Sequence, residues 1–527
     1  MVKRLIAGAL VGCAAVGVVL SNLASVGTAR ERPATATTLV VAAGADGYYE
    51  NPKLPSIGEY PTNANIYDTL VRMTPQYTVV PDLAVHWRFV RPNTWRFFLR
   101  RRVRFQNGKP FDARAVVYTM HLLATSGSGA YIGIDKKAKV RPHGRYVVDI
   151  TPSFPNRRLV EQLVHPENSI VAPGSKPSHP IGTGPFKFVS YQRNQQITAT
   201  RWNGYWGPKS KLSKLVFKFI PDANGRVLAL ESGGVKAAFD IPRESASSVA
   251  SHSGLRVARS PVGAYEALYF DIRGAADYDL GQDQAVRKAV ELAIDREVIV
   301  KDVWRGNAAA VQTMVPPAVL GQYRRLVHGF KYNPAQARQV LDADGWKTGS
   351  GGIRTKSGRK LSLTLVVGFP NADIHGTMPE ALQSMLRQVG IDLKIVKAPD
   401  ENTYSSLLSA GKGDLFAEVG NQNDANPCFL PDLLFYFKGS SHGDYGYRFG
   451  PGGTFDRVIA SMCRKGVSEA TARRGAAEAM HILVDEKQVV VPIAGVFRIY
   501  GLSKKVNGFQ PNPSQTNQSW TGVSLSK

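Results

Sequence analysis

Patterns that mark an enzyme or a metalloprotein are scarce in this chain. Its 527 residues include only 3 cysteines and 10 histidines, with no H-E-x-x-H pair, no Cys/His cluster and no G-x-x-x-x-G-K-[ST] loop. Zinc chemistry and nucleotide hydrolysis therefore lack support, and we predict no catalytic residue, no metal and no cofactor. A G-x-S-x-G pattern at 439–443 is followed by glycine-rich sequence that cannot form the helix an esterase elbow needs. A secreted hydrolase using Ser441 stays a distant alternative, and scattered carboxylates leave a glycosidase pair open.

Acidic residues are outnumbered, with 41 Asp and Glu against 66 Lys and Arg and a formal net charge of +25. The excess favours contact with anionic lipid, cell-wall polymer or nucleic acid, or it serves solubility alone. The run RRRVRF at 100–105 alternates basic residues with Val103 and Phe105, which predicts a half-buried strand rather than a nucleic-acid patch. No nucleic-acid partner is predicted.

Only the N-terminus holds a long apolar run. Lys3 and Arg4 precede apolar residues 5–20, and small residues follow near position 29, which predicts a secretory signal peptide over 1–29. The chain is then exported, to the periplasm or to the outer face of the cytoplasmic membrane. The sequence LVGC at 10–13 also fits a lipobox, so a lipid anchor on Cys13 is the alternative. Cleavage leaves Cys428 and Cys463, whose disulfide is a hypothesis based on the oxidising compartment.

The length predicts two or three α/β or α+β domains. Apolar runs and turn residues predict strands at 39–43, 87–90, 94–99, 196–201, 214–220, 264–270, 361–367, 391–396, 414–419 and 489–493. Apolar periodicity and caps predict helices at 65–73, 113–124, 224–230, 284–304, 333–345, 379–389, 404–408 and 470–486. The order strand, helix, strand over 361–396 predicts a parallel pair with a right-handed crossover.

One stretch has the composition of a ligand site. Residues 418–427, EVGNQNDANP, bring glycine, amides and an aspartate directly after an apolar strand. Polar groups at the open end of a buried strand are where α/β proteins hold ligands, although the same residues also form ordinary turns. A similar polar and aromatic stretch follows the strand at 39–43.

Five spaced motifs resemble one known family. They are PDLA at 81–84 before Trp87, LRRRVRFQNGKPF at 99–111, GTGPF at 182–186, VRKA at 286–289 with AIDR at 293–296, and NPAQA at 333–337 up to GW at 345–346. In order and spacing the chain resembles the bacterial extracellular solute-binding proteins of family 5, the peptide and nickel type that feeds ABC importers. The resemblance covers nearly all of the chain after residue 29.

The resemblance implies an α/β, two-lobed periplasmic-binding-protein-like fold, type II, in the large variant with an extra domain. The first lobe is expected at 39–65, 180–266 and 490–527, the extra domain at 66–179, and the second lobe at 267–489. Two crossing segments form the expected hinge, at Leu268, Tyr269, Phe270, Val490 and Val491. Closure on a ligand between the lobes is a population shift toward the liganded form.

The resemblance also implies the guest and the partners. Peptide-binding members place an Asp four residues before a Pro, where this chain has Asn423 before Pro427, and dipeptide binders place an Arg where it has residues 369–373, FPNAD. We therefore predict a peptide or peptide-like solute held by amides, aromatics and backbone, at Tyr48, Tyr49, Glu50, Asn51, Phe369, Asn371, Gly420, Asn421, Asn423 and Asp424. A nickel chelate, an oligosaccharide or an opine-like solute is the alternative. The expected partners are an ABC permease with its ATPase subunits, and the receptor is expected to be monomeric.

Overall fold

The structure is a computed structural model that describes residues 37–44, 63–91, 93–125, 129–130, 132–176, 178–273, 277–368, 377–422, 424–431, 453–464, 467–514 and 517–526. All that follows concerns residues 37–527, which form one compact unit. The predicted signal peptide and Cys13 lie outside the described residues. Among the described helices, none has the length and apolar character needed to cross a bilayer.

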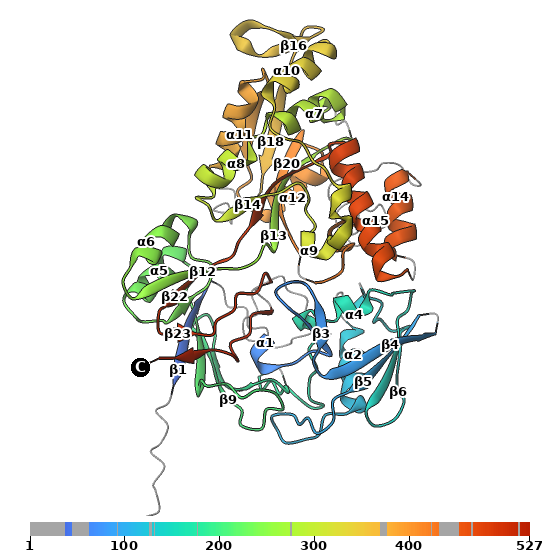
Figure 1. Cartoon of the computed structure of the whole chain (residues 1–527), viewed down its shortest axis with the longest axis vertical. Coiled ribbons are helices and arrows are strands. Elements are labelled where there is room, and N and C mark those ends of the chain that lie inside the picture. Colours follow the sequence, from blue (N-terminus) through green and yellow to red (C-terminus); the bar gives the residue numbers. More distant parts are fainter. Residues whose placement is uncertain are drawn as a thin grey trace, which may run out of the picture. The chain divides into compact units, whose positions relative to one another are not determined.

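A seven-stranded sheet gathers strands from both ends of the chain (Figure 1). In spatial order it contains β12 (Leu255–Arg259), β22 (Ile499–Ser503), β11 (Ala237–Ala238), β1 (Thr38–Ala43), β10 (Lys214–Phe219), β9 (Gln196–Arg201) and β8 (Phe186–Gln192). β1 pairs in parallel with β10 and β11, and the other neighbours are antiparallel. The helices α5 (Ala223–Glu231) and α6 (Ala246–Ser251) pack beside it.

A six-stranded sheet forms the second large core. Its order is β14 (Ala308–Ala310), β21 (Val490–Val496), β13 (Ala264–Phe270), β20 (Leu415–Asn421), β18 (Ser362–Val367) and β19 (Asp392–Lys397). The parallel pairing predicted across 361–396 is confirmed by the register of β18 with β19. Its helices are α7 (Gln284–Ala293), α8 (Arg296–Val298), α10 (Pro334–Ala343), α11 (Met378–Arg387) and α12 (Glu401–Ser409), and beyond them lie α9 (Pro317–Leu320), α14 (Thr454–Val458) and α15 (Glu469–His481).

A four-stranded sheet lies within residues 66–179. Its order is β4 (Ala84–Arg91), β5 (Thr94–Leu99), β7 (Val147–Thr151) and β6 (Lys139–Pro142), all antiparallel. The helix α2 (Ala113–Leu123), which Asp112 caps through Arg114 N, covers one face and buries Val116, Met120 and Leu123. Shorter elements are α1 (Asn63–Ile66), β2 (Val71–Met73), β3 (Val79–Pro81), α4 (Leu159–Gln162), β15 (Lys347–Thr348), β16 (Arg354–Lys356), β17 (Arg359–Lys360), β23 (Val506–Asn507) and β24 (Ser524–Leu525).

Three predicted elements are wrong. Helix 65–73 stops at Ile66, because the carbonyls of Thr69 and Leu70 accept from Leu83 N and Ala84 N in a strand-like pairing. Strand 100–105 is a loop, because Arg102 has φ +63°. Its alternation is nevertheless real, since Val103 and Phe105 are buried.

The predicted helix 284–304 is divided. Ile294 is extended (φ −92°, ψ 115°), and the Asp295 side chain accepts from Glu297 N and Val298 N and so begins a new helix. The strong apolar periodicity of the segment predicted its buried face but not this interruption. A π-helical turn, Ile299–Val303, follows α8.

Two short crossings connect the large sheets. β12 continues into β13 through residues 260–263, and β21 continues into β22 through residues 497–498. The crossings are bonded to each other, because Ser260 N donates to Arg498 O and Arg498 N donates to Ser260 Oγ, both at 3.0 Å. The predicted hinge residues Leu268, Tyr269, Phe270, Val490 and Val491 are buried and lie in paired strands of the six-stranded sheet. The predicted hinge and domain boundaries stay predictions.

Candidate ligand-binding site

The end of β20 is folded into a compact polar loop by Gln422. Gln422 N donates to Gly263 O at 2.9 Å, and its Nε2 donates to the carbonyls of Asp424 and Asn426, both at 2.9 Å. Gln422 is fully buried, yet its Oε1 has no hydrogen-bond partner among the described residues. An unpaired buried acceptor costs roughly 1–3 kcal/mol, so this oxygen marks a place for a donor.

Asp424 lies in the same loop with its carboxyl group buried. Its Oδ1 accepts from Asn426 N at 3.0 Å and from Gln422 Nε2 at 3.2 Å. Burial, with a smaller contribution from Glu161, raises the pKa of Asp424 to about 8. At neutral pH the group is therefore mostly protonated and presents no full negative charge to a cationic ligand group.

Two tyrosines meet at this loop. The Tyr77 hydroxyl lies 3.1 Å from Val262 O and 3.4 Å from Gln422 O, and Tyr77 itself has φ +59°. This conformation is costly for a side chain other than glycine, and the two hydroxyl contacts hold it in place. Burial raises the pKa of Tyr77 and of Tyr265, so both are neutral hydroxyls.

Tyr265 stands between two glycines of neighbouring strands. In the register of the sheet, Tyr265 of β13 pairs with Gly420 of β20 on one side and Gly495 of β21 on the other. Cross-strand partners point to the same face, so no side chain from either partner lies beside the ring. The Tyr265 hydroxyl is buried and has no hydrogen-bond partner among the described residues. Together with Gln422 it gives the site two unpaired groups.

Arginines position the segments of the seven-stranded sheet that approach the site. Arg226 donates from Nε to Phe239 O and from Nη2 to Asp240 O, and its Nη1 bonds the carbonyls of Ile220 and Pro221. This guanidinium also lies against Gly44, where the polar stretch after β1 begins. Arg498 reaches Asp240 at 3.4 Å.

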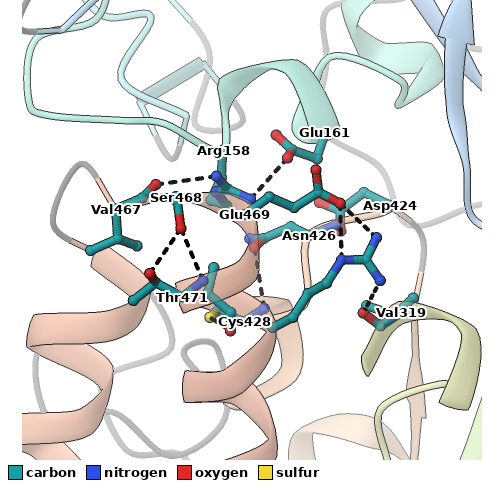
Figure 2. A network of polar contacts seen from close by, with 12 residues as sticks. Arg158, Glu161, Val319, Asp424, Asn426, Cys428, Val467, Ser468, Glu469 and Thr471 are labelled. Carbon is teal, nitrogen blue, oxygen red and sulfur yellow. Dashed lines mark hydrogen bonds and ion pairs between the residues drawn. The ribbon is translucent and has the colours of Figure 1, made fainter. Parts of the chain in front are cut away.

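Polar contacts of α4 and α15 lie beside the loop of Asp424, as Figure 2 shows. Arg158 donates to Val467 O at 3.3 Å and pairs with Glu161 at 2.9 Å. Burial raises the pKa of Glu161, whose carboxyl group also feels Glu469. On α15, Arg473 pairs with Glu469 at 2.7 Å.

The hypothesised disulfide is present. Cys428 and Cys463 are joined, with their Cα atoms 5.7 Å apart. Cys428 N donates to Asn426 Oδ1 at 3.2 Å, so the bridge holds the loop that carries Asp424 close to the helical turn Ile459–Arg464.

The structure places three of the ten predicted ligand residues. Gly420 and Asn421 end β20, and Asp424 follows in its loop. The remaining predicted ligand residues lie outside the described residues, as does Ser441: Tyr48, Tyr49, Glu50, Asn51, Phe369, Asn371 and Asn423. Sequence reasoning missed Tyr77, Tyr265 and Arg498, and it included Gln422 only as a member of the stretch 418–427. Among these residues only Tyr265 has a signal in the sequence, namely the glycines that lie opposite it in the neighbouring strands. Recognising this signal requires the strand register.

Metal ligands do not gather in the described part of the chain. No group of three or more His, Cys, Asp or Glu side chains there is arranged to hold a metal ion.

Comparison with protein families gives one match across most of the chain. The profile of the bacterial extracellular solute-binding proteins, family 5 Middle, matches residues 78–442. The nickel-binding periplasmic protein of Escherichia coli K12 is 26% identical over 414 residues, which are 75% of this chain and 77% of that protein. The glutathione-binding protein GsiB of Salmonella paratyphi A is 27% identical over 318 residues, and this match spans only 57% of either chain.

Solved structures share the fold. NikA from Brucella suis in complex with Fe(III)-EDTA superposes with a TM-score of 0.80 at 24% identity, covering 93% of this chain and 100% of that one. DppA from Helicobacter pylori in complex with the peptide STSA gives a TM-score of 0.70 at 22% identity, covering 93% and 98%. The two-lobed periplasmic-binding-protein fold expected from sequence is confirmed.

Proposed function

The chain belongs to the bacterial extracellular solute-binding proteins of family 5, and on that premise we propose that it captures a peptide or peptide-like solute for an ABC importer. Its relatives and structural neighbours are binding receptors rather than enzymes. We propose that this chain likewise binds its solute without turnover, as an exported monomer that delivers it to a membrane permease and its ATPase subunits.

Two unpaired atoms, one in the loop after β20 and one on β13, carry the proposal. Gln422 Oε1 needs a donor, and the Tyr265 hydroxyl can donate to an acceptor. A peptide backbone offers both N–H donors and C=O acceptors, so it can supply a partner for each atom. The ligand residues proposed from sequence, including Tyr48 and Asn423, would add aromatic and amide contacts around this centre.

Charge recognition is weaker here than in a site built on an ionised carboxylate. Asn423 is an amide where peptide-binding members have an Asp, and Asp424 is mostly protonated at neutral pH because burial raises its pKa to about 8. We therefore propose that affinity comes from the solute's backbone and uncharged parts more than from its amino terminus.

Closure of the lobes would bend the chain at its two crossings. We place this bending at residues 260–263 and 497–498 rather than inside β13 and β21. Leu268 is paired with Ala417 on one side and with Val491 on the other, whereas the crossings are short segments between the sheets.

Calorimetric titration of the purified chain tests the proposal. The panel is di- to tetrapeptides, glutathione, Ni(II) with histidine, and a neutral oligosaccharide, after a thermal-shift screen. For the solute that binds, Tyr265→Phe is expected to weaken affinity about 5- to 10-fold, since one hydrogen bond is worth roughly 1 kcal/mol. Tyr500→Phe is the matched control, because Tyr500 is equally buried but belongs to the seven-stranded sheet and contacts Asn512 O.

The outcomes separate the alternatives. Unchanged affinity in Tyr265→Phe, Tyr48→Ala and Asn423→Ala would show that the site is misplaced. Binding of the nickel complex or the oligosaccharide, with no peptide bound, would support the receptor function but show that the solute is not a peptide. Turnover of a peptide or ester that Ser441→Ala abolishes would show that the chain is a hydrolase and not a receptor.

A further inference from the structure

The positive charge of the chain is concentrated in one domain. Residues 66–179 contain 18 Lys and Arg but only 7 Asp and Glu, and so contribute 11 of the 25 net positive charges in about a fifth of the sequence. Two of these acids, Asp68 and Asp82, are buried. The solvent-facing charge of this segment is therefore more basic than its composition indicates.

The four-stranded sheet arranges part of this charge in a plane. One register row runs across all four strands, from Arg88 to Arg96, Asp149 and Arg141. The adjacent row contains Thr94, Thr151 and Lys139. Strands lie about 4.8 Å apart, so the first row spans roughly 14 Å.

This face is open to solvent, whereas the other is not. Residues of the alternate rows, Phe97, Val148 and Ile150, are fully buried in the core that α2 covers (Figure 1). Arg88, Lys139 and Arg141 are exposed. Within the row the single acid, Asp149, is neutralised by Arg96 at 2.7 Å. Arg88 lies over the Phe98 ring at 5.7 Å, so it stays on the face rather than folding away.

We infer that this sheet face, here called the basic face and defined by Arg88, Lys139 and Arg141 around the Arg96–Asp149 pair, docks on a bilayer surface that contains anionic lipid headgroups. A flat array of separated cations matches a planar anionic surface, whereas a single polyanion strand would need cations aligned along a groove. Docking would hold the receptor beside the membrane, where the permease of its proposed function resides.

Vesicle co-sedimentation tests the inference. The protein is the chain from Arg30 onward, which includes the whole compact unit 37–527, with no solute added, so the result is independent of the proposed ligand site. Vesicles contain either phosphatidylcholine alone or phosphatidylcholine with 30% phosphatidylglycerol. We expect binding to the anionic vesicles only, and its loss in 0.5 M salt because exposed charges are then screened.

Matched triple variants separate this face from overall charge. Each exposed cation contributes about 5-fold to the binding of an anionic surface, so Arg88→Gln/Lys139→Gln/Arg141→Gln is expected to lower the partition constant on the order of 100-fold. The control Lys301→Gln/Lys331→Gln/Lys394→Gln removes the same charge from exposed positions in residues 267–489 and is expected to change it less than 3-fold. Unchanged circular dichroism and thermal midpoint show that both variants fold.

Three results would overturn the inference. They are equal binding to neutral vesicles, equal weakening by the two triple variants, and a soluble polyphosphate that binds as tightly per charge as the vesicles and depends on the same three residues. The last would make the face a general polyanion site instead of a bilayer site.

Discussion

The free energy of unfolding is expected to fall as pH rises because of Asp424, and Asp424→Asn is expected to abolish this decrease. In the folded state burial raises the pKa of Asp424 from its ordinary 3.8 to about 8. Between these values the unfolded chain releases the proton while the folded chain keeps it, so the free energy of unfolding falls with rising pH. Above about pH 8 both states are ionised, and this contribution becomes constant. Asparagine keeps an oxygen for Asn426 N and Gln422 Nε2 but does not titrate.

The size of the effect follows from the two pKa values. One pKa unit corresponds to about 1.4 kcal/mol, so between pH 5 and pH 8 the wild type should lose roughly 3–4 kcal/mol that Asp424→Asn keeps. With about 2.1 cal/mol/K of unfolding entropy per residue, a unit of this length would shift its thermal midpoint by about 1 °C per kcal/mol. The midpoint difference between variant and wild type should therefore grow by roughly 3–4 °C across this range.

Thermal unfolding of both proteins at half-unit steps from pH 4.5 to pH 9 measures the difference. Asp414→Asn is the control, because burial raises the pKa of Asp414 only to about 6 and its difference should stop growing near that pH. A difference for Asp424→Asn that is constant from pH 5 to pH 8 would refute the buried, protonated carboxyl group and with it the uncharged character proposed for the ligand site.

Two further changes test the framework of the site. Cys428→Ser/Cys463→Ser removes a disulfide that links residues 35 positions apart, and it should lower the free energy of unfolding by about 3–4 kcal/mol. Urea denaturation without reductant measures this difference. Equal stability of the variant and the wild type would mean that the disulfide does not form in solution. Gly263→Ala would place Cβ 2.4 Å from Pro513 O at a crossing between the sheets. It should therefore lower the free energy of unfolding by more than about 1 kcal/mol and weaken solute binding. An unchanged thermal unfolding midpoint would show that the crossing is less tightly packed than described.

Elements with a continuous local signal could be predicted from sequence. The strands β13, β18 and β19 are apolar runs bounded by turn residues, and the helix α10 has Asn333 and Pro334 at its start and Gly345 beyond its end. The prediction of one helix at 284–304 was wrong because, in the sequence, Asp295 looks like a polar position on the surface of a helix. In the structure the same side chain caps the next helix.

Only the site residues that lie next to one another in the sequence could be predicted. Gly420, Asn421 and Asp424 continue a buried strand, so their place at a strand end could be inferred from composition. Tyr265 looks like one more core aromatic in an apolar run, and its role depends on which residues lie opposite in β20 and β21. Tyr77 lies in a short turn far away in sequence and reaches Gln422 only through tertiary folding. Contacts of this kind leave no periodic trace in a sequence.

The position of β22 in the seven-stranded sheet constrains the order in which the parts of this protein can fold. β22, at residues 499–503, lies between β11 and β12 and pairs with both, although the chain reaches these two strands more than 240 residues earlier. Until the last tenth of the chain is available, both strands expose unpaired backbone edges, and a long loop must close before β22 can pair with them. The seven-stranded sheet therefore completes last, so a chain truncated before residue 499 should be caught by proteases and chaperones rather than survive as a smaller receptor.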